Sequence, residues 1–204
     1  VAMLEDATAA MKQIAKSGKK ILFVATKKQA KGIVAETAAA LNMPFITERW
    51  PGGLLTNFAT IRKSIKKMQT IDKMKENGTF DSLSKRERLQ IDRQRAKLDL
   101  NLGSIVKMTR MPEAVFIVDT GKENIALAEA NKLGIRSFAM NDTNTNPNLV
   151  SFPIPSNDDA SKSIQCIMSI VKTAIAEGLE ERGADQEAKA VEKKEKAKKI
   201  TEEK

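Results

Sequence analysis

The sequence has no histidine, no tyrosine and a single cysteine among its 204 residues. Without histidine, the chain lacks the commonest general base and the commonest ligand of transition metals. A single cysteine cannot form an internal disulfide, which fits a reducing compartment. Cys166 lies inside an apolar periodic run, and we interpret it as a small core residue.

Aromatic residues are also scarce, at 4% of the chain. This scarcity argues against a surface on which single-stranded bases stack. No apolar run approaches the roughly 18 residues that a membrane span needs. The first residues include Glu5 and Asp6 and no cleavable apolar segment, so we expect no signal peptide.

Positive charge is abundant and unevenly distributed. The formal net charge is +9, and the isoelectric point is near 9.6. Residues 60–110 hold 14 Lys and Arg against 6 Asp and Glu, a net of +8, whereas residues 1–59 and 111–183 together are neutral. A solvated helix face could account for such a run. However, a one-sided run of this size repels itself, which favours an anionic partner, with nucleic acid before an acidic membrane.

Alternating strand and helix patterns predict a parallel α/β domain with helices on both faces. The expected strands are residues 21–26, 44–49, 114–119, 135–140 and 150–154. The expected helices of this domain are residues 2–17, 27–41, 124–133 and 161–177. We place the last strand at an edge, because Pro153 cannot donate to a central ladder.

The stretch Arg49–Arg62, which reads RWPGGLLTNFATIR, marks the junction between this domain and a basic insertion. Pro51 and two glycines predict a tight turn after a strand, and Thr56 or Asn57 can cap the helix that follows. We interpret Trp50 and Phe58 as wedge and core residues rather than as base stackers.

The basic insertion is predicted to be an antiparallel helical hairpin. A second helix begins at Ser84, and Glu87 stands three residues later, as in a capping box. Gln94 and Arg95 interrupt the apolar stripe of this helix, so we expect imperfect pairing. The domain organisation is then an α/β body at 1–59 and 106–180, a hairpin at 60–105 and a charged tail at 181–204, whose residues 184–204 form either a solvated helix or a disordered segment.

Four acids follow predicted strands and suggest an alternative, metal-dependent enzyme. They are Asp119, Asp142, Asp158 and Asp159, at the strand ends where ligands bind in parallel sheets. Such carboxylates could hold Mg²⁺. We favour structural roles for these acids. Asp119 and Asp142 lie where Asx turns form. Asn157, Asp158 or Asp159 can cap the last helix.

Two further alternatives concern anions and membranes. Thr26-Lys27-Lys28-Gln29 begins a helix, where free N–H groups could take a phosphate, but the glycines of a nucleotide-binding loop are missing. A phosphate of an RNA backbone is therefore preferred over a nucleotide at this site, and we expect the chain to bind no cofactor.

The hairpin could instead lie on an anionic membrane, yet it lacks aromatic anchors. Its Lys and Arg without interleaved aromatics favour phosphate contacts on folded RNA.

Over roughly residues 3–180 the sequence resembles the bacterial and organellar small-subunit ribosomal protein two family. Five segments match in order. They are ILFVATKKQA (21–30), RWPGGLLTNFATIRKSI (49–65), KLDLNLGSI (97–105), FIVDTGKENIALAEANKLGI (116–135), and NDTNTNP through PIPSNDDASKSI (141–164). Arg95 departs from the family pattern, where an apolar residue is usual.

The resemblance implies a flavodoxin-like parallel sheet with a projecting helical hairpin and no catalysis. It implies a structural role in the small ribosomal subunit, binding to small-subunit rRNA, and contacts with neighbouring proteins that include the large mRNA-binding ribosomal protein one. The residues expected to contact rRNA phosphates are Lys27, Lys28, Arg49, Arg62, Lys63, Lys66, Lys67, Arg86, Arg88, Arg93, Lys107 and Arg110.

Overall fold

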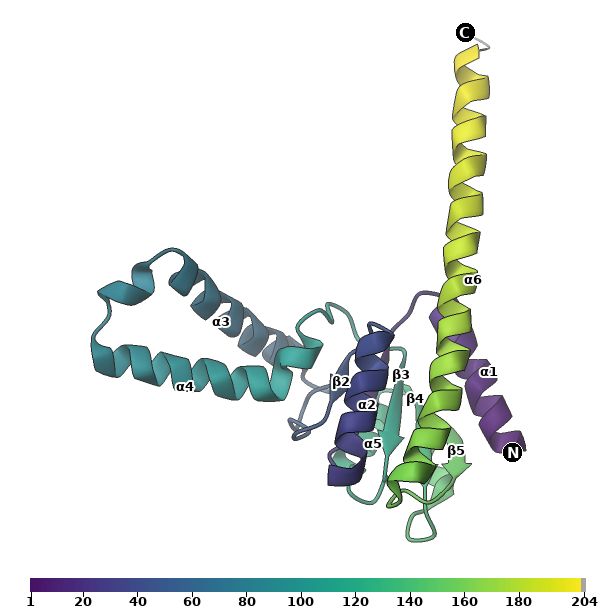
Figure 1. The fold of residues 1–204 in the computed structure, drawn as a ribbon, viewed down its shortest axis with the longest axis horizontal. Coiled ribbons are helices and arrows are strands. Elements are labelled where there is room, and N and C mark those ends of the chain that lie inside the picture. Colours follow the sequence, from purple (N-terminus) through teal and green to yellow (C-terminus); the bar gives the residue numbers. More distant parts are fainter. Residues whose placement is uncertain (203–204) are drawn as a thin grey trace.

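The computed structural model describes the backbone of residues 1–202 and the side chains of residues 1–186. Its centre is a five-stranded sheet in the order β2-β1-β3-β4-β5, with helices on both faces (Figure 1). A helical hairpin projects from one side of this body, and the last helix extends beyond it. All strand pairs are parallel, so the strand order confirms the predicted flavodoxin-like fold.

The strands form where the sequence has short apolar runs. They are β1 (Ile21–Val24), β2 (Phe45–Ile46), β3 (Ala114–Val118), β4 (Arg136–Asn141) and β5 (Phe152–Pro155). Every residue of β1 and β3 is buried, as expected for central strands of a parallel sheet. β5 is an edge strand, as predicted, and Pro153 lies in it where a missing N–H is tolerated. β2, at the other edge, is shorter than the predicted strand.

Two apolar clusters cover the two faces of the sheet. On one face, α1 (Ala2–Lys16), α2 (Lys28–Ala40) and α6 (Ser161–Glu202) pack on the phenylalanines of the central strands. On the other face lie α5 (Asn124–Lys132), Trp50, Leu54 and Leu55, together with the root of the hairpin. The hairpin is therefore anchored in the hydrophobic core.

Helix α6 corrects two sequence-based expectations. It continues past Glu177 and is helical to Glu202, although its side chains from residue 187 onward lie outside the described part. Cys166 is exposed, and so is Ile170, so the interpretation of Cys166 as a core residue is wrong. A helix turns by about 100° per residue, which puts Ile164, Met168 and Val171 on the inner face and Cys166 on the opposite one.

Candidate nucleic-acid interface

The basic insertion forms the predicted hairpin of two antiparallel helices. It comprises α3 (Phe58–Glu76), the 3₁₀ turn η1 (Thr79–Ser82), α4 (Lys85–Leu102) and a second 3₁₀ turn, η2 (Gly103–Ile105). The capping box at the start of α4 is confirmed, because the backbone N–H of Ser84 donates to Glu87 at 3.1 Å and the Glu87 N–H donates back to the Ser84 hydroxyl at 3.4 Å. Gly78 supplies the left-handed backbone at the turn, with φ +71°.

The two helices are joined by charge as well as by apolar packing. Helix α3 buries Ile65, Met68 and Ile71, whereas α4 buries only Leu102. Arg95, which interrupts the apolar stripe of α4, donates to Asp72 of α3 at 2.6 Å. Lys75 and Asp92 form a second ion pair between the helices, at 2.5 Å. Part of the hairpin's basic charge is thus used internally.

A group of cations on the hairpin remains free for a partner. Lys63, Lys66 and Lys67 are exposed on α3, and Arg86 and Arg93 are exposed on α4. Among the side chains that the structure describes, the hairpin's ion pairs are made by other residues than these five. Arg88 is half-buried and lies 3.8 Å from Asp81. We call these five residues the hairpin cations.

Arg62 has an internal role. Its guanidinium donates to the carbonyl of Met108 at 3.1 Å and more weakly to that of Val106 at 3.5 Å. It thereby joins the first turns of α3 to the segment through which the chain leaves the hairpin. This geometry counts against Arg62 as a dedicated phosphate ligand, since one nitrogen of its guanidinium already holds the exit segment.

The other predicted residues do not lie on one surface. Lys107 and Arg110 are exposed just before β3, near the N-terminal ends of the strands. Lys28 and Arg49 are exposed on the opposite side, near the C-terminal ends of β1 and β2. The twelve predicted residues are thus distributed over the hairpin and two opposite sides of the body.

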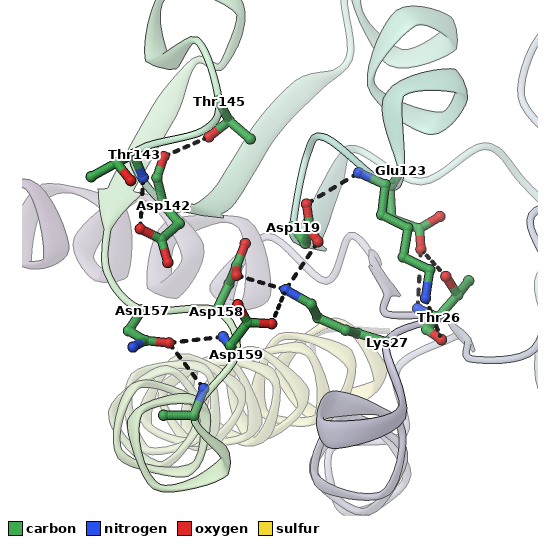
Figure 2. A network of polar contacts seen from close by, with 12 residues as sticks. Thr26, Lys27, Asp119, Glu123, Asp142, Thr143, Thr145, Asn157, Asp158 and Asp159 are labelled. Atoms are coloured by element: carbon green, nitrogen blue, oxygen red, sulfur yellow. Dashed lines mark hydrogen bonds and ion pairs between the residues drawn. The ribbon is translucent and has the colours of Figure 1, made fainter.

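Lys27 lies in a network of acids between the start of α2 and the start of α6 (Figure 2). Its ammonium is 2.7 Å from Asp158, 2.7 Å from Asp159 and 3.1 Å from Asp119. Burial alone would lower the pKa of Lys27, but these three carboxylates outweigh it and raise the pKa above its usual value. This arrangement counts against Lys27 as a phosphate ligand, since its charge is already balanced by carboxylates of the protein.

Asp119 and Asp142 perform the turn roles that the sequence favoured, and Asn157 performs the capping role. The Asp119 carboxylate accepts the Lys122 N–H at 3.1 Å, and Asp142 accepts the Thr143 N–H at 2.6 Å. Asn157 caps the start of α6, accepting the N–H groups of residues 159 and 160 at 2.9 Å each. These contacts explain why acidic and amide side chains stand at the strand ends.

Among the side chains that the structure describes, Asp142, Asp158 and Asp159 could hold a metal ion, since each offers an oxygen within 4.8 Å of the others. Asp158 is buried, and burial together with repulsion from Asp119 and Asp159 raises its pKa despite the contact with Lys27. The Lys27 ammonium already supplies positive charge here. The negative charge of this cluster is thus partly balanced by Lys27, which pairs with Asp158 and Asp159.

Glu129 of α5 is a central residue of the site that sequence reasoning missed. Its carboxylate accepts hydrogen bonds from the Trp50 indole at 3.1 Å, from the N–H groups of Gly53, Leu55 and Thr56 at 2.7, 2.9 and 3.1 Å, and from the Thr56 hydroxyl at 3.2 Å. Burial alone would raise the pKa of Glu129, but these donors lower it. The available signal was a glutamate on the inner face of a helix, between Ala126 and Ala130.

Trp50 and Phe58 take the roles expected from the sequence. Trp50 is buried, and Phe58 is half-buried against the same apolar cluster, so neither is presented for base stacking. Between this loop, the hairpin root and the start of α5 lies a hollow of about 800 Å³. Arg49 and Lys97 contribute to its lining, together with Ile61, Leu98 and Ile125.

These features define a class: a flavodoxin-like α/β protein whose strand-end acids serve turns and an internal lysine, and whose free cations lie on a projecting hairpin. The family model described as ribosomal protein S2 matches residues 1–178. The chain belongs to the ribosomal protein S2 family.

Relatives in this family are highly similar. The small ribosomal subunit protein uS2 of Flavobacterium johnsoniae is 63% identical over 191 residues, which cover 94% of this chain and 75% of that protein. The proteins of the same name from Flavobacterium psychrophilum and Phocaeicola vulgatus are 64% and 63% identical and cover 92% and 91% of this chain. The match spans 70% and 66% of those two proteins.

Family membership decides between the alternatives that the sequence left open. Ribosomal protein S2 is a structural protein of the small ribosomal subunit and not an enzyme, which excludes the metal-dependent enzyme and places the chain on ribosomes in the cytoplasm. Within the described residues, no helix is long and apolar enough to span a membrane.

Proposed function

We propose that this chain binds small-subunit rRNA by contacting backbone phosphates with the hairpin cations, and thereby supports translation. The observation that carries the proposal is the group of exposed lysines and arginines without carboxylate partners on a segment of net charge +8. Cations on both helices of one projecting arm match an extended row of phosphates better than they match a single small anion.

Lys107 and Arg110 form a second, smaller contact region in this proposal. Both are exposed at the beginning of β3, where Lys20 is also found, since the Glu113 N–H donates to the Lys20 carbonyl at 3.0 Å. Lys28 and Arg49, on the opposite side of the body, are candidates for separate phosphates. Lys27 and Arg62 are left out, because their charged groups are used inside the protein.

The test compares two triple variants of identical net charge. The first, Lys63→Glu, Lys66→Glu and Lys67→Glu, reverses three hairpin cations. The second, Lys132→Glu, Lys162→Glu and Lys172→Glu, reverses three exposed lysines of α5 and α6. Each tagged chain is expressed in cells, and its co-migration with small subunits is followed on density gradients at low and high salt.

We expect the hairpin variant to be lost from small subunits and the control variant to remain. For the unmodified chain, binding should weaken steeply as salt rises, because phosphate contacts release counterions with a slope of about 0.7 to 0.9 per contact. Equal retention of both variants would contradict the proposal for this face.

The chain is also proposed to contact neighbouring small-subunit proteins, among them the large mRNA-binding ribosomal protein one. The relatives' names say only that those proteins belong to the small subunit. What supports protein contacts here is the exposed body surface away from the hairpin. Small subunits purified from cells that lack this chain should carry less ribosomal protein one than subunits from cells that make it, measured by quantitative mass spectrometry.

A further inference from the structure

Glu129 connects two parts of the chain that are far apart in sequence. It lies on α5, and the donors that it accepts lie in residues 50–56, immediately before α3. Both carboxylate oxygens are used, Oε1 by Trp50 and Gly53 and Oε2 by Leu55 and Thr56. A single side chain therefore fixes the position of most of the loop.

The loop leads directly into the hairpin. The Asn57 N–H donates to the Gly53 carbonyl at 2.7 Å, and Asn57 is the residue that immediately precedes α3, in the N-cap position but without a side-chain capping bond. Leu54 and Leu55 are buried, and they belong to the same apolar cluster as Ile65 and Leu102 of the hairpin root. Movement of the loop would therefore move the first turn of α3.

The exit from the hairpin is held in a different way. There, Arg62 binds two carbonyls, and the Ser104 hydroxyl donates to the Phe45 carbonyl of edge strand β2. Among the described residues, the entry loop makes no hydrogen bond to a strand of the sheet. It contacts the body through its apolar side chains and through Glu129. Its polar attachment to the body is the Glu129 carboxylate.

We infer that Glu129 is a positioning residue for the hairpin, whose carboxylate fixes loop 50–57 and with it the direction in which α3 and α4 leave the body. An arm held in one direction presents its cations to a folded RNA without first losing conformational freedom. The step from arm direction to rRNA affinity rests on the proposed function. The step from Glu129 to arm direction does not.

The chain offers a matched control for this inference. Glu123 is also a buried glutamate near the start of α5, and it accepts hydrogen bonds from Thr26, at 3.1 Å from the N–H and also from the hydroxyl. Thr26 does not belong to the hairpin loop. Glu129→Gln and Glu123→Gln therefore remove equivalent charges from buried sites, but only the first one loosens the entry to α3.

The measurement is a distance distribution between the hairpin and the body in the full chain. Cys166 is exposed and is the sole cysteine in the sequence, so it carries one spin label. Glu76→Cys, exposed at the end of α3, carries the other. Pulsed electron resonance gives the width of the distribution, and circular dichroism ensures that the compared proteins are equally folded.

We expect Glu129→Gln to widen the distribution about twofold and Glu123→Gln to leave it unchanged. Trp50→Phe, which removes one donor and keeps an aromatic ring, should give an intermediate width and serves if Glu129→Gln does not fold. A distribution that stays narrow in both loop variants would overturn the inference. Equal widening in Glu129→Gln and Glu123→Gln would also overturn it, because the effect would then be a general loosening of the body.

Binding to rRNA separates this inference from the proposed function. At equal folded fraction, Glu129→Gln should weaken binding to isolated small-subunit rRNA about fivefold with an unchanged salt slope, because the same phosphates are contacted at a greater ordering cost. Reversal of Lys63, Lys66 and Lys67 should instead reduce the slope. If that reversal has no effect on rRNA binding, the proposed function fails, while the distance comparison still decides the role of Glu129.

Discussion

At the scale of the residue, the chain uses charges for internal structure that the sequence alone assigns to a partner. Lys27 is the clearest case, because its neighbour Lys28 is exposed while Lys27 binds three carboxylates from other segments. The residue types are identical and adjacent. Which of them faces RNA is decided by the fold, since the carboxylates come from residues 119, 158 and 159.

Replacing Lys27 by methionine is expected to destabilise the protein by about 3 kcal/mol at pH 7, since it leaves buried carboxylates without a counter-charge. In the unmodified chain, the raised pKa of Lys27 means that its stabilising contribution is complete below the normal lysine pKa and is lost only at strongly alkaline pH. In the variant, Asp158, whose pKa is already raised, is expected to take up a proton more readily in the folded state. The loss should therefore shrink as pH falls into the carboxylate range.

Urea unfolding of both proteins at pH 7 and pH 4 measures this difference in free energy of unfolding. Lys28→Met is the control, and it should change the stability by less than about 0.5 kcal/mol at either pH. A Lys27→Met loss that is no larger than the loss in this control would show that the acid network contributes nothing to stability.

At the scale of the element, the packing of α1 against α6 depends on a glycine. A Cβ at Gly178 would lie 2.5 Å from the carbonyl oxygen of Lys12 in α1, whereas a Cβ at Gly183, in the same helix, would meet nothing within 4 Å. The two positions have the same helical backbone and different surroundings. They separate helix propensity from packing.

Gly178→Ala is expected to destabilise the protein by about 1 to 3 kcal/mol, because the two helices must move apart. Gly183→Ala should stabilise it by up to about 1 kcal/mol, since alanine favours the helix and nothing opposes it. Thermal unfolding of both variants measures the two effects. The packing argument would be contradicted if Gly178→Ala were as stable as Gly183→Ala.

The elements themselves could be predicted largely from local signals. Continuous apolar runs indicated β1 and β3, and the serine–glutamate spacing indicated the start of α4. The contacts that complete the site could not be predicted in this way. Glu129 meets Gly53 across 76 residues, and Arg62 meets Met108 across 46, so neither partner can be recognised from neighbouring sequence. The exposed side of α6 was misjudged because apolar residues, including Cys166 and Ile170, occur on more than one face of this helix.

At the scale of the whole molecule, positive charge is concentrated away from the core. The body is close to neutral, whereas residues 60–110 have a net charge of +8. In the free chain, the cations of the hairpin repel one another, and ion pairs such as Arg95 with Asp72 compensate only part of this repulsion. In the proposed function, rRNA phosphates supply the missing negative charge.

The triple reversal of Lys63, Lys66 and Lys67 should therefore stabilise the isolated chain while it prevents assembly into small subunits. Each reversal replaces a positive charge by a negative one and lowers the net charge by two, so the net charge of residues 60–110 falls from +8 to +2. We expect the melting temperature at low salt to rise by roughly 2 to 4 °C, and the difference to vanish near 1 M salt, where charges more than about 3 Å apart are screened. The variant of Lys132, Lys162 and Lys172 has the same net charge but changes the neutral body, so its melting temperature should rise less. If both variants rose equally, only total charge would matter, and the hairpin would not be the part of the molecule that depends on an anionic partner.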